Sequence, residues 1–170
     1  YGVKFSPFLK NANELLEKGR PLRALSPLCA ALVLAPRNFD TLNSLATFFT
    51  LLKRDNLTVI TTDHNLSLHR NLLQAHICHF SALVRNNERN RAVACLTSAA
   101  ERFSDSCNSL ITISENLFLV GHSAASAKID YKLINEFSLR ENQYIQIFSR
   151  LLTESRLLPV IDELSVKCQS

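Results

Sequence analysis

The segment spanning residues 116–126, NLFLVGHSAAS, places a serine directly after a glycine and a histidine. An apolar run followed by Gly-x-Ser is the local pattern of a hydrolase nucleophile elbow, where a strand, a tight turn and a helix expose the serine hydroxyl. In that fold the catalytic acid and histidine follow the serine, yet His122 is the last histidine of this sequence. No glycine-rich loop is present to donate amides to an oxyanion. We therefore expect no catalytic residue, with Gly121 ending one helix and Ser123 capping the next.

Three histidines and a cysteine lie close together further upstream, at His69, His76, Cys78 and His79. On a helix with 3.6 residues per turn, His69 and His76 lie almost on one line and His79 lies about 80 degrees away. Histidine ligands on one helix usually stand four residues apart, and a structural zinc ion needs four ligands. The i, i+3 pair leaves two ligands unaccounted for. We expect hydrogen-bonded or solvent-edge histidines, and no metal or other cofactor.

Basic residues cluster at the predicted turns between helices: Lys18, Arg20, Arg23, Lys53, Arg54, Arg85, Arg89 and Arg91. The net charge of +4 is too mild to indicate nucleic-acid binding without clustering on one face. A stripe of these side chains would receive an acidic or phosphorylated peptide, or a nucleic-acid backbone. No aromatic residues alternate with them to stack on bases.

The composition indicates a folded helical domain. Of 170 residues, 46% are hydrophobic and 20% charged, and only three are glycine, which disfavours a turn-rich sheet protein. Five cysteines without a C-x-x-C pair predict free thiols in a reducing compartment, hence an intracellular protein of the cytoplasm or nucleus. The longest nearly uncharged run, residues 110–120, is too short to span a bilayer, so we expect no membrane partner. The chain begins without Met, as expected for a domain cut from a longer protein.

Apolar residues at helical spacing predict an all-α chain. The Thr-rich segment 55–63, DNLTVITTD, interrupts the pattern and predicts a loop or short extended insert. A long helix should then run from residue 63 or 65 to about residue 84. The other expected helices span residues 6–18, 22–34, 41–52, 91–103, 107–120, 123–137, 139–153 and 157–167.

The first two predicted helices resemble a tetratricopeptide repeat, a helix–turn–helix unit of about 34 residues. The residues that carry this resemblance are Phe8, Ala12, Ala24, Leu28, Ala31 and Pro36, and a new unit begins at Phe39 with Leu42, Leu45, Ala46 and Phe49. Small side chains let two helices approach closely, while the larger ones fill the gap to the next unit. A weaker third copy covers residues 73–105, with Phe80 in a position that the family keeps small.

The resemblance implies an all-α helical-repeat superhelix of antiparallel helix hairpins. We interpret residues 1–170 as a single domain, with a tetratricopeptide-like part at 5–54, the insert at 55–63 and degenerate hairpins at 64–170. It also implies a non-catalytic scaffold that docks a partner peptide or helix within an intracellular multi-subunit complex. First helices line the groove of such repeats, so Asn13 and Asn43 are the expected contacts, with Arg20 at the rim.

Two alternatives remain open at this stage. Arg85, Arg89 and Arg91 also belong to the candidate binding surface, and they would serve a helical nucleic-acid-binding domain that uses its basic turns. The apolar end of the chain, with Leu151, Leu152 and residues 157–161, is compatible with an obligate interface. Self-association is left undecided.

Overall fold

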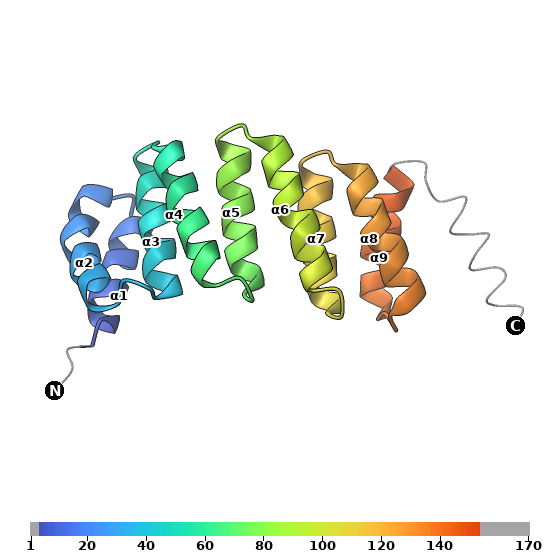
Figure 1. Cartoon of the computed structure of the whole chain (residues 1–170), viewed down its shortest axis with the longest axis horizontal. Helices are drawn as coiled ribbons and strands as arrows, with labels where there is room; N and C mark the ends of the chain where they lie inside the picture. Colours follow the sequence, from blue (N-terminus) through green and yellow to red (C-terminus); the bar gives the residue numbers. More distant parts are fainter. Residues whose placement is uncertain (1–3, 154–170) are drawn as a thin grey trace, which may run out of the picture. The chain divides into compact units, whose positions relative to one another are not determined.

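The computed structural model describes residues 4–153, and all regular structure within them is α-helical (Figure 1). The helices alternate between a first and a second member of successive pairs. They are α1 (Ser6–Glu17), α2 (Pro21–Leu34), α3 (Phe39–Leu51), α4 (Asp55–Leu68), α5 (Leu73–Arg85), α6 (Arg89–Arg102), α7 (Cys107–Leu119), α8 (Ser123–Glu136) and α9 (Glu141–Thr153). No described helix is long and apolar enough to cross a bilayer. The helix predicted for residues 157–167 lies outside the described part.

The helices recur with the period that defines a tetratricopeptide unit, about 34 residues. First helices begin at Phe39, Leu73, Cys107 and Glu141. Second helices begin at Pro21, Asp55, Arg89 and Ser123, with the same spacing. This register extends beyond the two N-terminal repeats in which the consensus residues are recognisable.

A left-handed residue at the same repeat position reverses the chain within each pair. Gly19, Lys53, Asn87 and Gly121 have φ values of +64°, +55°, +64° and +80°. The amide of each donates to a carbonyl three residues back, and the next amide donates to a carbonyl five residues back, as in His122 to Leu117 at 2.9 Å. This double hydrogen bond is the Schellman motif, which ends a helix and satisfies its last carbonyls.

The prediction of a loop or extended insert at 55–63 was wrong, because these residues form most of α4. Threonine hydroxyls return to the helix backbone: Thr58, Thr61 and Thr62 donate to carbonyls four residues earlier, at 2.8–3.2 Å. Thr58 and Thr62 are also buried. Packing of this face, which also carries the buried Val59, against neighbouring helices therefore outweighs the β propensity of threonine and valine.

The predicted long helix up to residue 84 was also wrong, because α4 ends at Leu68 and α5 begins at Leu73.

Contacts divide the chain into two compact units, with the boundary between Cys95 and Leu96 inside α6. The single-domain interpretation of residues 1–170 remains a prediction.

Each compact unit has its own buried apolar cluster. In the first unit Ala12 and Leu16 of α1 pack with Ala24 and Leu28 of α2 and Phe48 of α3. In the second unit the core joins residues of α7, α8 and α9: Leu110, Ile111, Ala127, Leu133, Ile134, Ile147 and Leu151. The close approach of α1 and α2 in Figure 1 follows from the small side chains of Ala12 and Ala24, both fully buried.

The repeated turn predicts a simple stability pattern. A Cβ built on Gly121 meets no atom within 4 Å, so Gly121→Ala should cost only backbone strain, about 1 kcal/mol of unfolding free energy. Lys53→Gly relieves that strain at the equivalent turn and should leave stability unchanged or slightly higher. Urea denaturation of both variants measures the difference. Equal losses in the two variants would contradict this account of the turn.

Candidate functional site

A groove of about 690 Å³ lies between the first helices α1 and α3 of the first compact unit. Its lining combines three leucines with a majority of polar side chains: Ser6, Leu9, Lys10, Asn13, Glu14, Leu16, Glu17, Asp40, Asn43, Ser44, Thr47 and Leu51. The two asparagines predicted as partner contacts, Asn13 and Asn43, both line this groove. That they contact a partner remains a prediction.

The groove holds one of these asparagines in place. The Oδ1 atom of Asn13 lies 2.6 Å from the hydroxyl of Ser44, which also lies 2.8 Å from the backbone oxygen of Asp40. Asn13 is half-buried, so its amide nitrogen keeps a defined position at the wall. A polar group held in this way loses little rotamer freedom when a ligand binds.

Negative charge dominates the groove. Glu14, Glu17 and Asp40 are exposed at its lining, where Lys10 is the one basic side chain among the described residues. None of these three carboxylates was among the residues predicted to contact a partner. Their positions on first helices were a usable signal, because first helices of successive pairs face one another.

The predicted arginines lie away from this groove. Arg20 is exposed at the N-cap of α2, and Arg85 and Arg89 are exposed on either side of the α5–α6 turn. Arg91 forms a close ion pair with Glu88. Two hydrogen bonds, the larger effect coming from Asn86 and the smaller from Arg91, hold the pKa of Glu88 below its ordinary value. The pairing neutralises part of the basic turn, and binding by these arginines stays untested.

The Gly-His-Ser segment is a helix-to-helix turn. Residues before Gly121 belong to α7, so no strand precedes Ser123 and the nucleophile elbow is ruled out. Gly121 ends the helix in a left-handed conformation, as predicted. The capping role assigned to Ser123 was wrong by one residue, because His122 is the N-cap and makes no side-chain cap hydrogen bond.

The histidines form hydrogen bonds to the protein, as predicted. The Nε2 atoms of His69 and His76 lie 2.9 Å from the carbonyl oxygens of Arg37 and Arg70. His79 lies 3.0 Å through Nδ1 from the buried hydroxyl of Thr62. Among the residues described here, no three His, Cys, Asp or Glu side chains gather to hold a metal ion.

Three of the described thiols, Cys78, Cys95 and Cys107, have surroundings that disfavour the reactive thiolate form. Burial, with a smaller contribution from Asp63, raises the pKa of Cys95 to about 11. Burial also raises the pKa of Cys78 and Cys107. These thiols stay protonated at neutral pH, and a protonated thiol is a poor nucleophile.

Burial lowers the pKa of His79, whose ring is almost completely enclosed. The Asp63 and Glu88 carboxylates oppose this shift, while Arg91 and His76 add to it. Protonation therefore costs more in the folded protein than in the unfolded chain. The contribution of the neutral His79 ring to stability is complete above the pKa of about 6.5 that histidine has in the unfolded chain. It is lost as the pH falls from that value through the lower pKa of the folded state.

Stability should therefore decrease as the pH is lowered from 7 to 5. Replacement of the titrating ring in His79→Gln should flatten this dependence, measured as urea unfolding free energy at several pH values. His64 is exposed on α4, and His64→Gln should retain the slope. An unchanged slope in His79→Gln would show that other groups cause the pH dependence.

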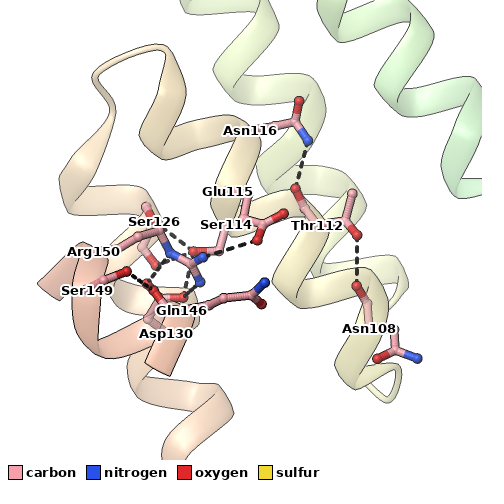
Figure 2. Close-up of polar contacts among 10 residues, drawn as sticks. All are labelled: Asn108, Thr112, Ser114, Glu115, Asn116, Ser126, Asp130, Gln146, Ser149 and Arg150. Carbon is pink, nitrogen blue, oxygen red and sulfur yellow. Dashed lines mark hydrogen bonds and ion pairs between the residues drawn. The ribbon is translucent and has the colours of Figure 1, made fainter. Parts of the chain in front are cut away.

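A buried polar cluster joins α7, α8 and α9 in the second compact unit (Figure 2). The Arg150 guanidinium donates two hydrogen bonds to the Asp130 carboxylate, at 3.0 and 2.7 Å. Ser114 donates to Asp130 at 2.6 Å and lies 2.8 Å from the Ser126 hydroxyl. Asp130 is fully buried and both its oxygens are bonded, so the cluster is a structural crosslink between helices.

Removal of one charge from this cluster should be severely destabilising. Asp130→Ala leaves the buried Arg150 without its main partner and should cost about 3–5 kcal/mol of unfolding free energy. The double change Asp130→Leu/Arg150→Met should recover much of that loss. Glu136→Ala on the same helix removes only the exposed Lys132–Glu136 pair and should cost less than about 1 kcal/mol. Similar losses in both single variants would contradict a buried crosslink.

Known structures share this arrangement of helices. The chain is similar to Pseudomonas aeruginosa pilF, with 14% identity over 97% of this chain and 75% of that chain and a TM-score of 0.61. It is similar to residues 41–end of MamA from Desulfovibrio magneticus RS-1, with 11% identity over 99% and 96% of the two chains and a TM-score of 0.58. YrrB, described as a TPR protein with an unusual peptide-binding site, has 13% identity over 88% and 77% and a TM-score of 0.54.

No protein-family model matches the sequence, and no curated protein matches it. The similarity is therefore one of fold, carried by the helix pairs and their repeat register. The chain has the tetratricopeptide-like helical-repeat fold that its first two helices indicated.

Proposed function

We propose that the protein is a non-catalytic interaction scaffold and that the α1–α3 groove docks an extended partner segment carrying basic and amide side chains. The observation that carries this proposal is the groove itself, with its excess of carboxylates. The partner would belong to an intracellular multi-subunit complex of which this chain is one component.

The groove offers what an extended peptide needs. A peptide backbone presents N–H and C=O groups in alternation, and an asparagine amide both donates and accepts. Asn13 and Asn43 lie on adjacent first helices along the groove. Leu9, Leu16 and Leu51 supply apolar contacts between the polar groups. This mixture suits a segment that places some side chains inward and others at the rim.

Charge selects the partner within this class. The whole sequence carries +4, whereas Glu14, Glu17 and Asp40 make the groove locally acidic. Local potential steers association and disfavours partners of like charge. A segment with Lys or Arg is therefore favoured, and a phosphate backbone is repelled from this groove.

The fold comparison supports the general class of function. YrrB, a protein of this fold, is described as having a peptide-binding site. Helical repeats bind partners along grooves because stacked pairs leave an extended, rigid surface between helices. The identity of the binding residues rests on the groove of this chain alone.

Selection from a random peptide library displayed on phage tests the proposal. Peptides enriched on the wild-type protein should carry Lys or Arg, and Glu14→Lys should weaken their binding at least about tenfold, or about 1.4 kcal/mol. Asn43→Ala should weaken binding by about 1 kcal/mol through a lost hydrogen bond. Fluorescence anisotropy with labelled synthetic peptides measures both changes.

Asp105→Lys is the matched control, because it makes the same charge change at an exposed residue outside the groove. Its binding should equal that of the wild type at matched ionic strength. Peptides insensitive to Glu14→Lys and Asn43→Ala would overturn the groove as the site. Binding of single-stranded nucleic acid that falls steeply with salt and is lost on charge reversal of Arg85, Arg89 and Arg91 would favour the alternative function.

A further inference from the structure

Helix α2 is apolar on both of its faces. Arg23 and Ser26 are the only polar side chains in the sequence of this helix. Its inner face, with Ala24, Leu28 and Ala31, is fully buried. A helix that is hydrophobic all round is normally covered all round. The outer face of α2 is nevertheless open among the residues that the structure describes.

The outer face carries a line of three exposed residues, Leu22, Cys29 and Val33, which we call the outer stripe. At about 100 degrees of rotation per residue, the three lie within about 40 degrees of one another, opposite the buried side chains. Leu22 is 76% exposed, and Val33 at 82% is the most exposed large hydrophobic side chain in the described part of the chain. Exposed apolar side chains gathered in this way mark an interaction surface.

The repeat register shows that a neighbouring helix pair does not cover the outer stripe. The α3–α4 pair contacts helices of the pairs before and after it, yet the stripe positions of α4 stay exposed. The residues one, two and three periods after Leu22 and Val33 are all exposed, and all but one are polar: Asn56, Asn90, Ala124, Ser67, Glu101 and Asn135. Apolar residues at these positions of α2 therefore point to a partner outside the repeat.

The charge around the outer stripe has one sign. Every charged residue between positions 18 and 39 is basic, and each is exposed: Lys18, Arg20, Arg23 and Arg37. The first three lie at the N-terminal end of the stripe and the last lies beyond its C-terminal end. A partner with carboxylates is favoured by this arrangement. A second copy of the chain is disfavoured, because two stripes would bring like charges together.

The dimensions of the outer stripe suit one helix of a partner. Leu22 and Val33 stand about 16 Å apart along the axis, or about three helical turns. Ser26, Cys29 and Ala30 between them are small, so a second helix can approach closely and place a large apolar side chain there. A helix that lies in a membrane surface carries Trp, Phe or Leu on one face and Lys or Arg along the other. In α2 the face opposite the stripe is buried in the fold, and the helix has no aromatic residue.

We infer that the outer stripe of α2 docks an amphipathic helix of a partner protein, with an apolar side chain over Cys29 and carboxylates beside the basic residues at both ends. This surface belongs to a second helix, whereas the α1–α3 groove is lined by first helices and is acidic. The inference does not depend on that groove binding a peptide. The two surfaces select partners of opposite charge.

A phage-displayed library of amphipathic helices of about 18 residues, three to five turns of which can lie along the stripe, tests the inference. The apolar positions are Leu, Ile or Phe, and the flanking positions vary between Glu and Lys. Helices selected on the wild-type protein should carry Glu at the flanks. At about ten times its dissociation constant, a selected synthetic peptide leaves about a tenth of the sites free, so alkylation of the exposed Cys29 by N-ethylmaleimide should slow about tenfold. Mass spectrometry of the Cys29 peptide measures the rate.

Val33→Asp places a carboxylate in the outer stripe and should weaken binding of the selected helices at least about tenfold. Because Val33 is so exposed, this variant should keep the urea unfolding midpoint of the wild type. Ser67→Asp is the matched control, since it introduces the same side chain at the corresponding exposed position of α4. Its binding should equal that of the wild type.

Selected helices rich in Lys, or helices that leave the alkylation of Cys29 unchanged, would overturn the inference. Equal binding by Val33→Asp and Ser67→Asp would do the same. Protection of Cys29 that rises with protein concentration, without any peptide, would identify a second copy as the occupant. Protection by phosphatidylserine vesicles but by no selected helix would identify a membrane surface. Either result would replace the acidic helix.

Discussion

The close contact between the two helices of a pair, present in α1–α2, α3–α4 and α7–α8, is the constraint on which the rest of the structure depends. Three positions carry it: one on the first helix and two on the second. In α1 and α2 these are Ala12, Ala24 and Leu28, all fully buried. A residue with positive φ stands seven positions after the first-helix residue, as Gly19 does after Ala12. It reverses the chain direction, so that the second helix packs against the first. Every groove and cluster described above is built on pairs arranged in this way.

Different chemistry fills the same contact in successive pairs. Alanine and leucine fill it in α1–α2, and threonines follow in α4, where Thr58 lies 3.3 Å from Thr50 of α3. In α7–α8 the contact is Ser114, Ser126 and Asp130, with the guanidinium of Arg150 closing it. Each polar version satisfies its own donors and acceptors, as burial requires. The helices of these pairs pack at the same repeat positions, although the side chains in contact are apolar in one pair and polar in another.

This change of chemistry explains what sequence reasoning could and could not reach. Periodic apolar residues predicted the fold class and the paired helices near Phe8–Pro36, because those pairs use apolar contacts. Residues 55–63 were misread, since threonine has a low intrinsic helix propensity, and the burial of Thr58 and Thr62 that overrides it depends on neighbouring helices. A search for the repeat period alone, without regard to residue type, would have placed α4.

The candidate groove was only partly predictable for a related reason. Asn13 and Asn43 were found because each lies on the polar side of a first helix, a property that one helix displays by itself. The acidic character depends on Glu14 and Asp40, which come together only when α1 and α3 stand side by side. The pattern of a single helix does not report a charge that is shared between helices of different pairs, and only the repeat register brings both residues onto first helices.

Buried polar contacts also restrict how the pairs can slip. An apolar interface tolerates small shifts, because one leucine contact resembles the next. The Asp130 carboxylate accepts hydrogen bonds from both Ser114 and Arg150, and a shift of one residue would leave a buried charge unpaired. The second compact unit therefore gains a specified register from the cluster, whatever its net contribution to stability. Where a groove is shaped by adjacent first helices, such a register decides which side chains face a ligand.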